Sequence, residues 1–183
     1  SASNKRNNST NKFTNAGTIT VSGMSSNLYL MDTLFNDGTL SLNTNNLLGD
    51  APLYNRDSLT MVNADVEVEC INAGVIHATI TADFTEPFTS EPGSKIVVEG
   101  DNQSNCIFRF HHTTTNHGEI ELTQSHWNEA TVTMQNASDT LINAADGVIS
   151  AVEGIGSPVA HRNISALCIN NGTITVDGPA TYL

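Results

Sequence analysis

Residues 15–21 read NAGTITV, and residues 170–176 read NNGTITV. Similar segments lie between them, as NDGTLSL at 36–42, NAGVI at 72–76 and NHGEIEL at 116–122, and weaker copies are NRDSLTM at 55–61, EPGSKIV at 91–97 and ADGVISA at 145–151. These eight copies place a turn residue, usually glycine, at positions 17, 38, 57, 74, 93, 118, 147 and 172. An internal repeat of this period is typical of solenoids and other repeat architectures.

The residues two and four positions after the turn residue are apolar in every copy, with the single exception of Lys95. The second position holds Ile19, Leu40, Leu59, Ile76, Lys95, Ile120, Ile149 and Ile174. The fourth holds Val21, Leu42, Met61, Ala78, Val97, Leu122, Ala151 and Val176. Apolar residues two apart lie on one face of a β-strand. Because one such strand per repeat cannot bury its own apolar face, the copies must stack on one another.

The sequence therefore predicts an all-β fold, a right-handed single-stranded parallel β-helix (β-solenoid) of about eight rungs, where a rung is one full turn of the coil. We expect a flexible segment at residues 1–12 and the β-helix over residues 13–183. The alternative is a sandwich or barrel of hairpins that reuses one turn. Hairpin strands would recur every 8–12 residues or so, about half the spacing of this motif.

The turn residues fit this fold. Glycine adopts positive φ at little cost, and asparagine in turns hydrogen-bonds to the backbone or to an asparagine on the next rung. Six of the eight copies carry asparagine two residues before the turn residue.

The repeats resemble those of the passenger regions of autotransporter and filamentous-haemagglutinin-type exoproteins, over nearly all of residues 13–178. The resemblance implies a fragment of a longer passenger, located extracellularly or on a bacterial outer cell surface. That class includes adhesins, self-associating proteins, toxins and enzyme carriers, so the resemblance indicates the architecture more strongly than the function. Three cysteines are a departure, because such passengers usually have few or none.

Charge excludes several partners. The chain has 7 Lys and Arg against 19 Asp and Glu, a net charge of −12. An acidic surface repels phosphate backbones and anionic lipid, so we expect no nucleic acid partner and no direct membrane insertion by this segment. Glycans and proteins stay possible.

The cysteines are expected to be free and structural. Cys70 and Cys168 occupy the same apolar repeat position, and by the assigned register they lie four rungs apart, roughly 19 Å. That is far beyond the reach of a disulfide. Cys106 lies between them in a strand-like segment. All three are predicted to be buried thiols.

The outward positions of the repeat give no sign of catalysis. An enzyme on this fold would place carboxylates and a base on neighbouring rungs, whereas acid occurs here on one rung only, at Glu119 and Glu121. We therefore predict no enzyme and no catalytic residue. Outward Thr and Ser pairs could form an ice-binding array, but Val75 and His77 interrupt it.

The last three repeats are longer than the first four and should extrude loops, where β-rods place recognition. The expected insertions are His111–Asn116, Ser125–Asn136 and Gly154–Asn163. They contain or border the candidate binding residues, Trp127, His126, His111, His112, His161 and Arg162. The histidine spacing matches no zinc motif, so we predict no metal and no cofactor. Trp127 could stack on a sugar or anchor a protein contact, or it could pack beneath a loop.

These observations predict a non-catalytic cell-surface adhesin or self-association segment that presents loops to a host glycan or protein, or to a second copy. The first alternative is a carbohydrate-active β-helix, such as a polysaccharide lyase or a phage tailspike-like hydrolase. The second is a structural stalk without a binding site.

Overall fold

The computed structural model describes residues 12–23, 26–155, 160–177 and 181–182. These residues form parallel strands and no helix, so no described segment is a helix that could span a membrane. The strands stack in three columns. Column A consists of β1 (Lys12–Asn15), β4 (Thr33–Asn36), β7 (Leu53–Asn55), β9 (Cys70–Asn72), β11 (Phe88–Ser90), β14 (Thr114–Asn116), β17 (Thr140–Asn143) and β20 (Leu167–Asn170).

The other two columns belong to one larger sheet. Column B consists of β2 (Thr18–Val21), β5 (Thr39–Asn43), β8 (Ser58–Glu67), β10 (Val75–Phe84), β12 (Lys95–Gly100), β15 (Glu119–Gln124), β18 (Val148–Ala151) and β21 (Thr173–Val176). Column C consists of β3 (Leu28–Leu30), β6 (Leu47–Gly49), the second halves of β8 and β10, β13 (Cys106–Phe110), β16 (Ala130–Met134), β19 (Arg162–Ser165) and β22 (Thr181–Tyr182). The two columns join because β8 and β10 pass from one into the other without a break.

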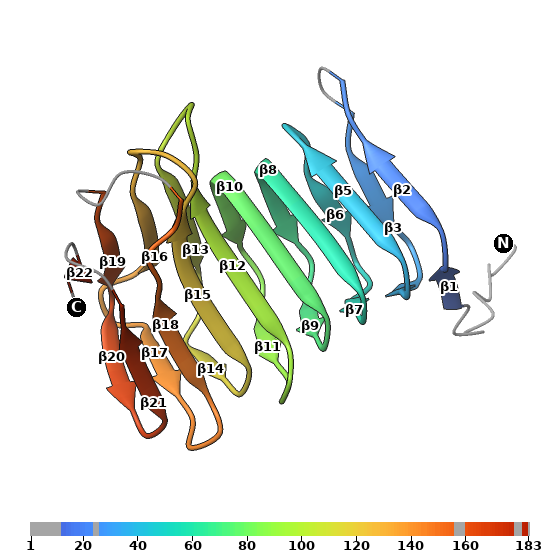
Figure 1. The fold of residues 1–183 in the computed structure, drawn as a ribbon. Coiled ribbons are helices and arrows are strands. Elements are labelled where there is room, and N and C mark those ends of the chain that lie inside the picture. The colour runs from blue at the N-terminus through green and yellow to red at the C-terminus, as the bar shows by residue number, and fades with distance from the viewer. Residues whose placement is uncertain (1–11, 24–25, 156–159, 178–180, 183) are drawn as a thin grey trace, which may run out of the picture.

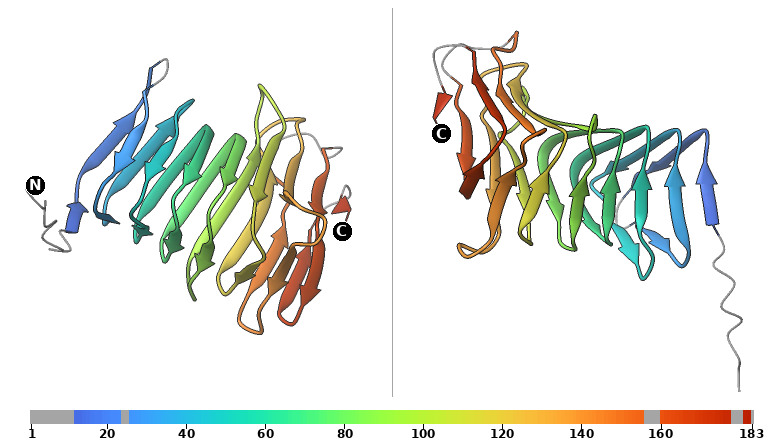
Figure 2. Two further views of the ribbon diagram at one scale, coloured as in Figure 1. Left: turned by 180° about the vertical axis from the view of Figure 1, so that it is seen from behind. Right: turned by 90° about the horizontal axis from the view of Figure 1, so that it is seen from below.

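The predicted β-helix is confirmed. The chain passes through columns A, B and C in turn and makes eight rungs in the described residues, all paired in parallel. Figures 1 and 2 show the rungs stacked along one axis in the right-handed sense, from β1 at one end to β21 at the other. Strand β1 begins at Lys12, one residue before the predicted start. The rest of the segment that was expected to be flexible lies outside the described residues.

The predicted register is right in seven rungs and wrong in the fifth. Val75 of rung 4 pairs with Lys95, and Lys95 pairs with Glu119 of rung 6. The turn residue of this rung is therefore Ser94, and the apolar positions are Ile96 and Val98, which are buried. Lys95 does not interrupt the core, because it points outward. The turn from Ser90 to Ser94 is longer than its neighbours, which shifts the repeat by one residue.

The interior is a continuous apolar core along the axis. Stacked Leu, Ile and Val side chains from columns A, B and C form most of it, and phenylalanines fill the interior at rungs 4 and 5. The rings of Phe84 and Phe108 are 5.4 Å apart, and those of Phe88 and Phe110 are 5.1 Å apart. Burying aromatic area of this size contributes strongly to stability, and these two rungs hold the buried aromatic part of the core.

A ladder of buried asparagine side chains runs along the corner after column A. Each Nδ2 donates to the Oδ1 of the next rung at 2.8 or 2.9 Å, in the pairs Asn15–Asn36, Asn36–Asn55, Asn55–Asn72, Asn116–Asn143 and Asn143–Asn170. The prediction of a stacked ladder is confirmed. Asn143 is a seventh member, which a longer turn had hidden, and Ser90 occupies the position in rung 5.

The turn glycines have a different role from the predicted one. Among the described glycines, positive φ occurs at Gly23, Gly49 and Gly93. Of the predicted turn glycines only Gly93 has it, and Gly93 lies one residue before the turn position of rung 5. At the turn position a Cβ on Gly74 would overlap the backbone oxygen of Asp57 on the rung before. The rungs approach too closely there for a side chain on Gly74, whereas Asp57 and Ser94 occupy the same position in rungs 3 and 5.

The three thiols are free, as predicted. Cys70 and Cys106 are fully buried, and burial raises both pKa values, that of Cys106 to about 12. The prediction of burial was wrong for Cys168, which is half-buried in rung 8, the last rung described.

The predicted insertions are shorter than expected. Residues 114–116 and 130–134 are strands of columns A and C, and β19 begins at Arg162. Rungs 5 to 7 are lengthened by the connections between their column B and column C strands, which are residues 101–105 in rung 5, residues 125–129 in rung 6 and the connection from β18 to β19 in rung 7. The repeat motif did not reveal the column C strands.

Candidate functional site

Four charged side chains converge on the outer face of column B. His77 on β10, Lys95 and Glu99 on β12 and Glu121 on β15 come from three successive rungs. The Nε2 atom of His77 lies 2.6 Å from Oε2 of Glu99, and Lys95 Nζ donates to Glu121 Oε2 at 2.7 Å. Lys95 Nζ also lies 3.4 Å from a carboxylate oxygen of Glu119. Strand stacking thus joins residues that are up to 44 positions apart in the sequence.

The lysine is held as a cation. Burial alone would lower the pKa of Lys95, but hydrogen bonds and charge from Glu121 and Glu119 outweigh burial and raise the pKa. On the far side, Ser150 Oγ of rung 7 donates to Glu119 Oε1 at 2.9 Å. These contacts fix the carboxylates without any ligand.

A groove of about 520 Å³ crosses this face from rung 4 to rung 7. It is lined by Val75, His77, Val97, Glu99, Glu121, Thr123, Gln124, Ser125, Gly154 and Ile155. Three of these are apolar side chains, and Val75 and Ile155 are largely exposed. Apolar walls combined with a few placed polar groups are characteristic of ligand sites.

Trp127 belongs to the loop at 125–129, which follows the groove residues Thr123 and Gln124 in the chain, although Trp127 itself does not line the groove. Its side chain is 65% exposed, and its ring packs edge-on against that of His126 at 5.4 Å. Ser125 of the same loop lines the groove. The loop is anchored on both sides of the tryptophan, because Ser125 N donates to Gly100 O at 2.9 Å and Asn128 Nδ2 donates to Asp101 O at 2.7 Å. Trp127 is therefore an exposed ring on a fixed loop, not a ring packed beneath one.

Two further predicted binding residues, His161 and Arg162, are neighbours in the sequence but differ in exposure. His161 is partly exposed, with Nδ1 3.0 Å from Glu129 Oε1 on the neighbouring rung. Arg162 is fully buried and donates from Nη1 to Gln124 Oε1 at 2.6 Å. Arg162 therefore cannot contact a surface ligand as predicted. It supports the base of the Trp127 loop instead.

The remaining candidates, His111 and His112, lie at the opposite end of column C, where β13 leads to column A. His111 Nε2 is 3.6 Å from Asp83 Oδ2, and His112 Nε2 is 3.1 Å from Thr85 O. The six predicted binding residues therefore do not form one site. None of the six lines the groove; Trp127 and His126 lie on the loop that begins with the groove residue Ser125, His161 contacts Glu129 at the end of that loop, and His111 and His112 lie at the other end of column C.

A second charged row lies on the outer face of column C. Asp65, Asp83 and Arg109 occupy successive rungs, and Arg109 Nη1 donates to Asp83 Oδ2 at 2.7 Å. Burial, and then the charges of Asp83 and Glu67, raise the pKa of Asp65. This row borders a small groove of about 280 Å³ whose charged lining residues are Asp50, Glu67, Glu69 and Glu86.

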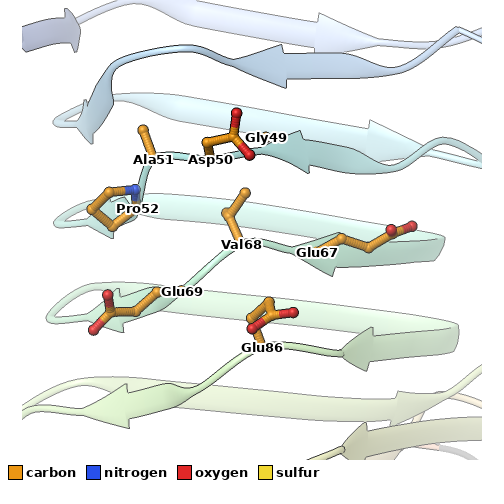
Figure 3. A pocket seen from close by; sticks show the side chains of 8 residues that line it. All are labelled: Gly49, Asp50, Ala51, Pro52, Glu67, Val68, Glu69 and Glu86. Carbon is orange, nitrogen blue, oxygen red and sulfur yellow. The ribbon is translucent and has the colours of Figure 1, made fainter.

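Figure 3 shows that the acidic side chains of this small groove do not converge. Glu67 and Glu69 point away from each other along one rung. Among the described residues, no group of three or more His, Cys, Asp or Glu side chains is arranged to hold a metal ion. The column C groove is therefore a weaker candidate than the column B groove.

The sequence pattern places His77 on the outward face but does not reveal its partner Glu99 or the outward position of Lys95. Both lie in rung 5, where taking Gly93 as the turn residue puts Lys95 in an apolar column and shifts the outward positions by one residue. The signal that could have found them is the apolar pair Ile96 and Val98, which fits the core columns without exception once Ser94 is the turn residue.

Comparison with known proteins gives no match, since no family model, curated protein or solved structure is significantly similar to the chain. Function is therefore argued from the groove itself.

Proposed function

We propose that this chain is a non-catalytic binding segment of a surface-exposed β-helix and that it holds a glycan chain in the column B groove beside Trp127. The observation that supports this is the groove itself, which spans four rungs and combines apolar walls with polar groups held in place by contacts between rungs. Sugars present both apolar ring faces and hydroxyls, and sites of this composition satisfy both.

Preorganisation strengthens the proposal. The carboxylates of Glu99 and Glu121 are each fixed by a partner on the same face, so binding does not have to order them. Rigid groups cost less conformational entropy on association than mobile ones. The scaffold beneath them is also rigid, because each of these strands pairs with a neighbour on both sides.

The cellular setting in this proposal is the extracellular space or a bacterial outer surface. It rests on the resemblance of the repeats to passenger β-helices and on the acidic composition, which disfavours nucleic acid and anionic lipid. Host protein and self-association are the other partners for such a segment, and the experiment below distinguishes them.

A glycan array, combined with analytical ultracentrifugation, tests the proposal. We expect a glycan to bind the monomer, and Trp127→Ala to weaken that binding about tenfold, since loss of an aromatic anchor costs more than about 1.4 kcal/mol. Tyr29→Ala is the matched control, because Tyr29 is similarly exposed but lies on rung 1, away from the groove. Concentration-dependent association without glycan binding would contradict the proposal.

A second candidate function is cleavage of a glycosidic bond. It is favoured by one observation, namely that Glu99 and Glu121 line the same groove on adjacent rungs. Glycosidases use two carboxyl groups that face the same substrate, one as acid and one as base or nucleophile.

Analysis of reducing ends after long incubation with the bound glycan distinguishes the two functions. We expect no product from the wild-type chain. If the wild-type chain does release product and neither Glu99→Gln nor Glu121→Gln does, the chain cleaves the glycan and the proposed non-catalytic function is refuted.

A further inference from the structure

The charge of the column B groove is negative. Its charged lining residues are Glu99, Glu121 and His77, and none of the residues that line it is a lysine or arginine. Lys95 lies beside the groove and contacts Glu121 and Glu119 from the adjoining side. This face of column B thus carries three carboxylates, those of Glu99, Glu119 and Glu121, for one permanent cation.

Glu99 is the less compensated of the two lining carboxylates. Its ion-pair partner is His77, which carries a charge only when protonated, whereas the partner of Glu121 is a lysine. The side chain of Glu99 is only 22% exposed and lies among Val97, Val75 and Ile155, where low-polarity walls strengthen the field that a ligand meets.

We infer that the ligand of this groove is a glycan that carries free amino groups, whose ammonium groups pair with Glu99 and Glu121. This inference rests on the proposed glycan-binding function and narrows it to a cationic amino sugar polymer. Acidic glycans are excluded by the same carboxylates, and neutral or N-acetylated ones leave Glu99 uncompensated.

A basic peptide fits this surface less well than an amino glycan does. An extended peptide needs partners for its backbone N–H and C=O groups. The backbones of β10, β12 and β15 are already paired with the rungs on either side, so this face offers no free strand edge. Sugar hydroxyls can use side-chain acceptors such as Thr123, and a ring face can stack on Trp127.

Isothermal titration with three matched oligosaccharides tests the inference. The probes are β-1,4-linked hexamers of glucosamine, N-acetylglucosamine and glucose, each measured at low and at high salt near neutral pH. We expect the glucosamine hexamer to bind at least tenfold more tightly than the other two and to lose most of this advantage at high salt, because screening weakens charge pairs.

The outcomes separate the two proposals. If none of the hexamers binds, and the array also gives no glycan, the proposed glycan-binding function fails. If the acetylated or neutral hexamer binds as tightly as the glucosamine hexamer, glycan binding stands and the cationic ligand is refuted. If an oligolysine of equal charge binds more tightly than the glucosamine hexamer, the partner is a basic protein segment and the inference is also overturned.

Two substitutions should move the affinity for the glucosamine hexamer in opposite directions. Glu99→Gln removes the uncompensated carboxylate and should weaken binding about tenfold. Lys95→Met frees Glu121 from its cation and should strengthen binding several-fold. Glu69→Gln is the matched control, because it makes the same change in net charge at the exposed corner between columns C and A, outside the groove. Equal effects of Glu99→Gln and Glu69→Gln on the affinity would mean that only the net charge of the chain matters, and would overturn the inference. Circular dichroism verifies that each variant is folded.

Discussion

At the scale of single residues, the asparagine ladder has one defect. The Nδ2 atom of Asn72 is buried and has no hydrogen-bond partner among the described residues, because the next rung carries Ser90. The shorter Ser90 side chain instead donates to Asn116 Oδ1 at 3.1 Å. A buried donor without a partner costs about 1–3 kcal/mol. The break in the ladder between Asn72 and Ser90 therefore lowers the stability of the folded chain.

We expect Ser90→Asn to raise the free energy of unfolding by about 1 kcal/mol, because asparagine would accept from Asn72 Nδ2 and still donate to Asn116 Oδ1 as serine does. The longer turn of this rung accommodates asparagine, since Asn143 precedes a turn of the same length and keeps its place in the ladder. Urea denaturation of the variant and the wild type measures the change.

Ser90→Asp is the control for this substitution. Aspartate has nearly the same shape and can accept from Asn72, but it has no N–H to donate to Asn116. It should therefore be no more stable than the wild type near neutral pH. Equal stabilisation by Asp and Asn would mean that side-chain volume, and not the ladder, sets stability at this position.

At the scale of elements, the corner before column B determines how closely two rungs can approach. A Cβ at Gly38, Gly74, Gly118, Gly147 or Gly172 would overlap atoms of the preceding rungs, whereas a Cβ at Gly17 has open space around it. None of these six glycines has a φ in the left-handed region. Glycine is therefore required at the five overlapping positions because the rungs stack closely, and not because of the turn conformation alone.

We expect Gly74→Ala to destabilise the chain by about 2 kcal/mol, the usual cost of forcing one extra carbon into a packed site. Gly17→Ala, the same change at the same repeat position, should be close to neutral. Thermal unfolding of both variants tests the pair. A similar loss of stability in both would show that the backbone conformation of the turn, and not contact between rungs, requires glycine.

At the scale of the whole molecule, each rung contacts mainly its two neighbours, so stability accumulates along the rod and the ends open first. The thiols report on this order. Cys70 and Cys106 lie in rungs 4 and 5 within the aromatic part of the core, and Cys168 lies half-buried in rung 8. Burial raises all three pKa values and slows reaction, because the thiolate is the reactive form.

We expect a thiol reagent at pH 8 to label only Cys168 in the native chain, and all three thiols in denaturant. Mass spectrometry of digested protein identifies the labelled positions, and Cys168→Ser should give no native labelling. Labelling of Cys70 or Cys106 at the same rate as Cys168 would mean that the rod opens cooperatively and not from its ends.

Much of the architecture follows from short-range pattern. The Ile19 and Val21 columns, the Asn15 ladder and the distance between Cys70 and Cys168 were all predictable, because every rung repeats the same local solution to burying one strand face. Column C was not predictable, because its strands have no turn motif, and in rungs 3 and 4 they are continuous with column B.

The sequence by itself determined the parallel β-helix, its eight rungs and the free thiols, since these depend on residues a few positions apart. Only the tertiary structure decided that Lys95 faces outward between Glu119 and Glu121, that Arg162 is buried, and that His77 meets Glu99 in a groove. The physical reason is register. A one-residue shift in one rung reverses which side chains face solvent, and the groups that make the groove come from different rungs and meet only when those rungs stack.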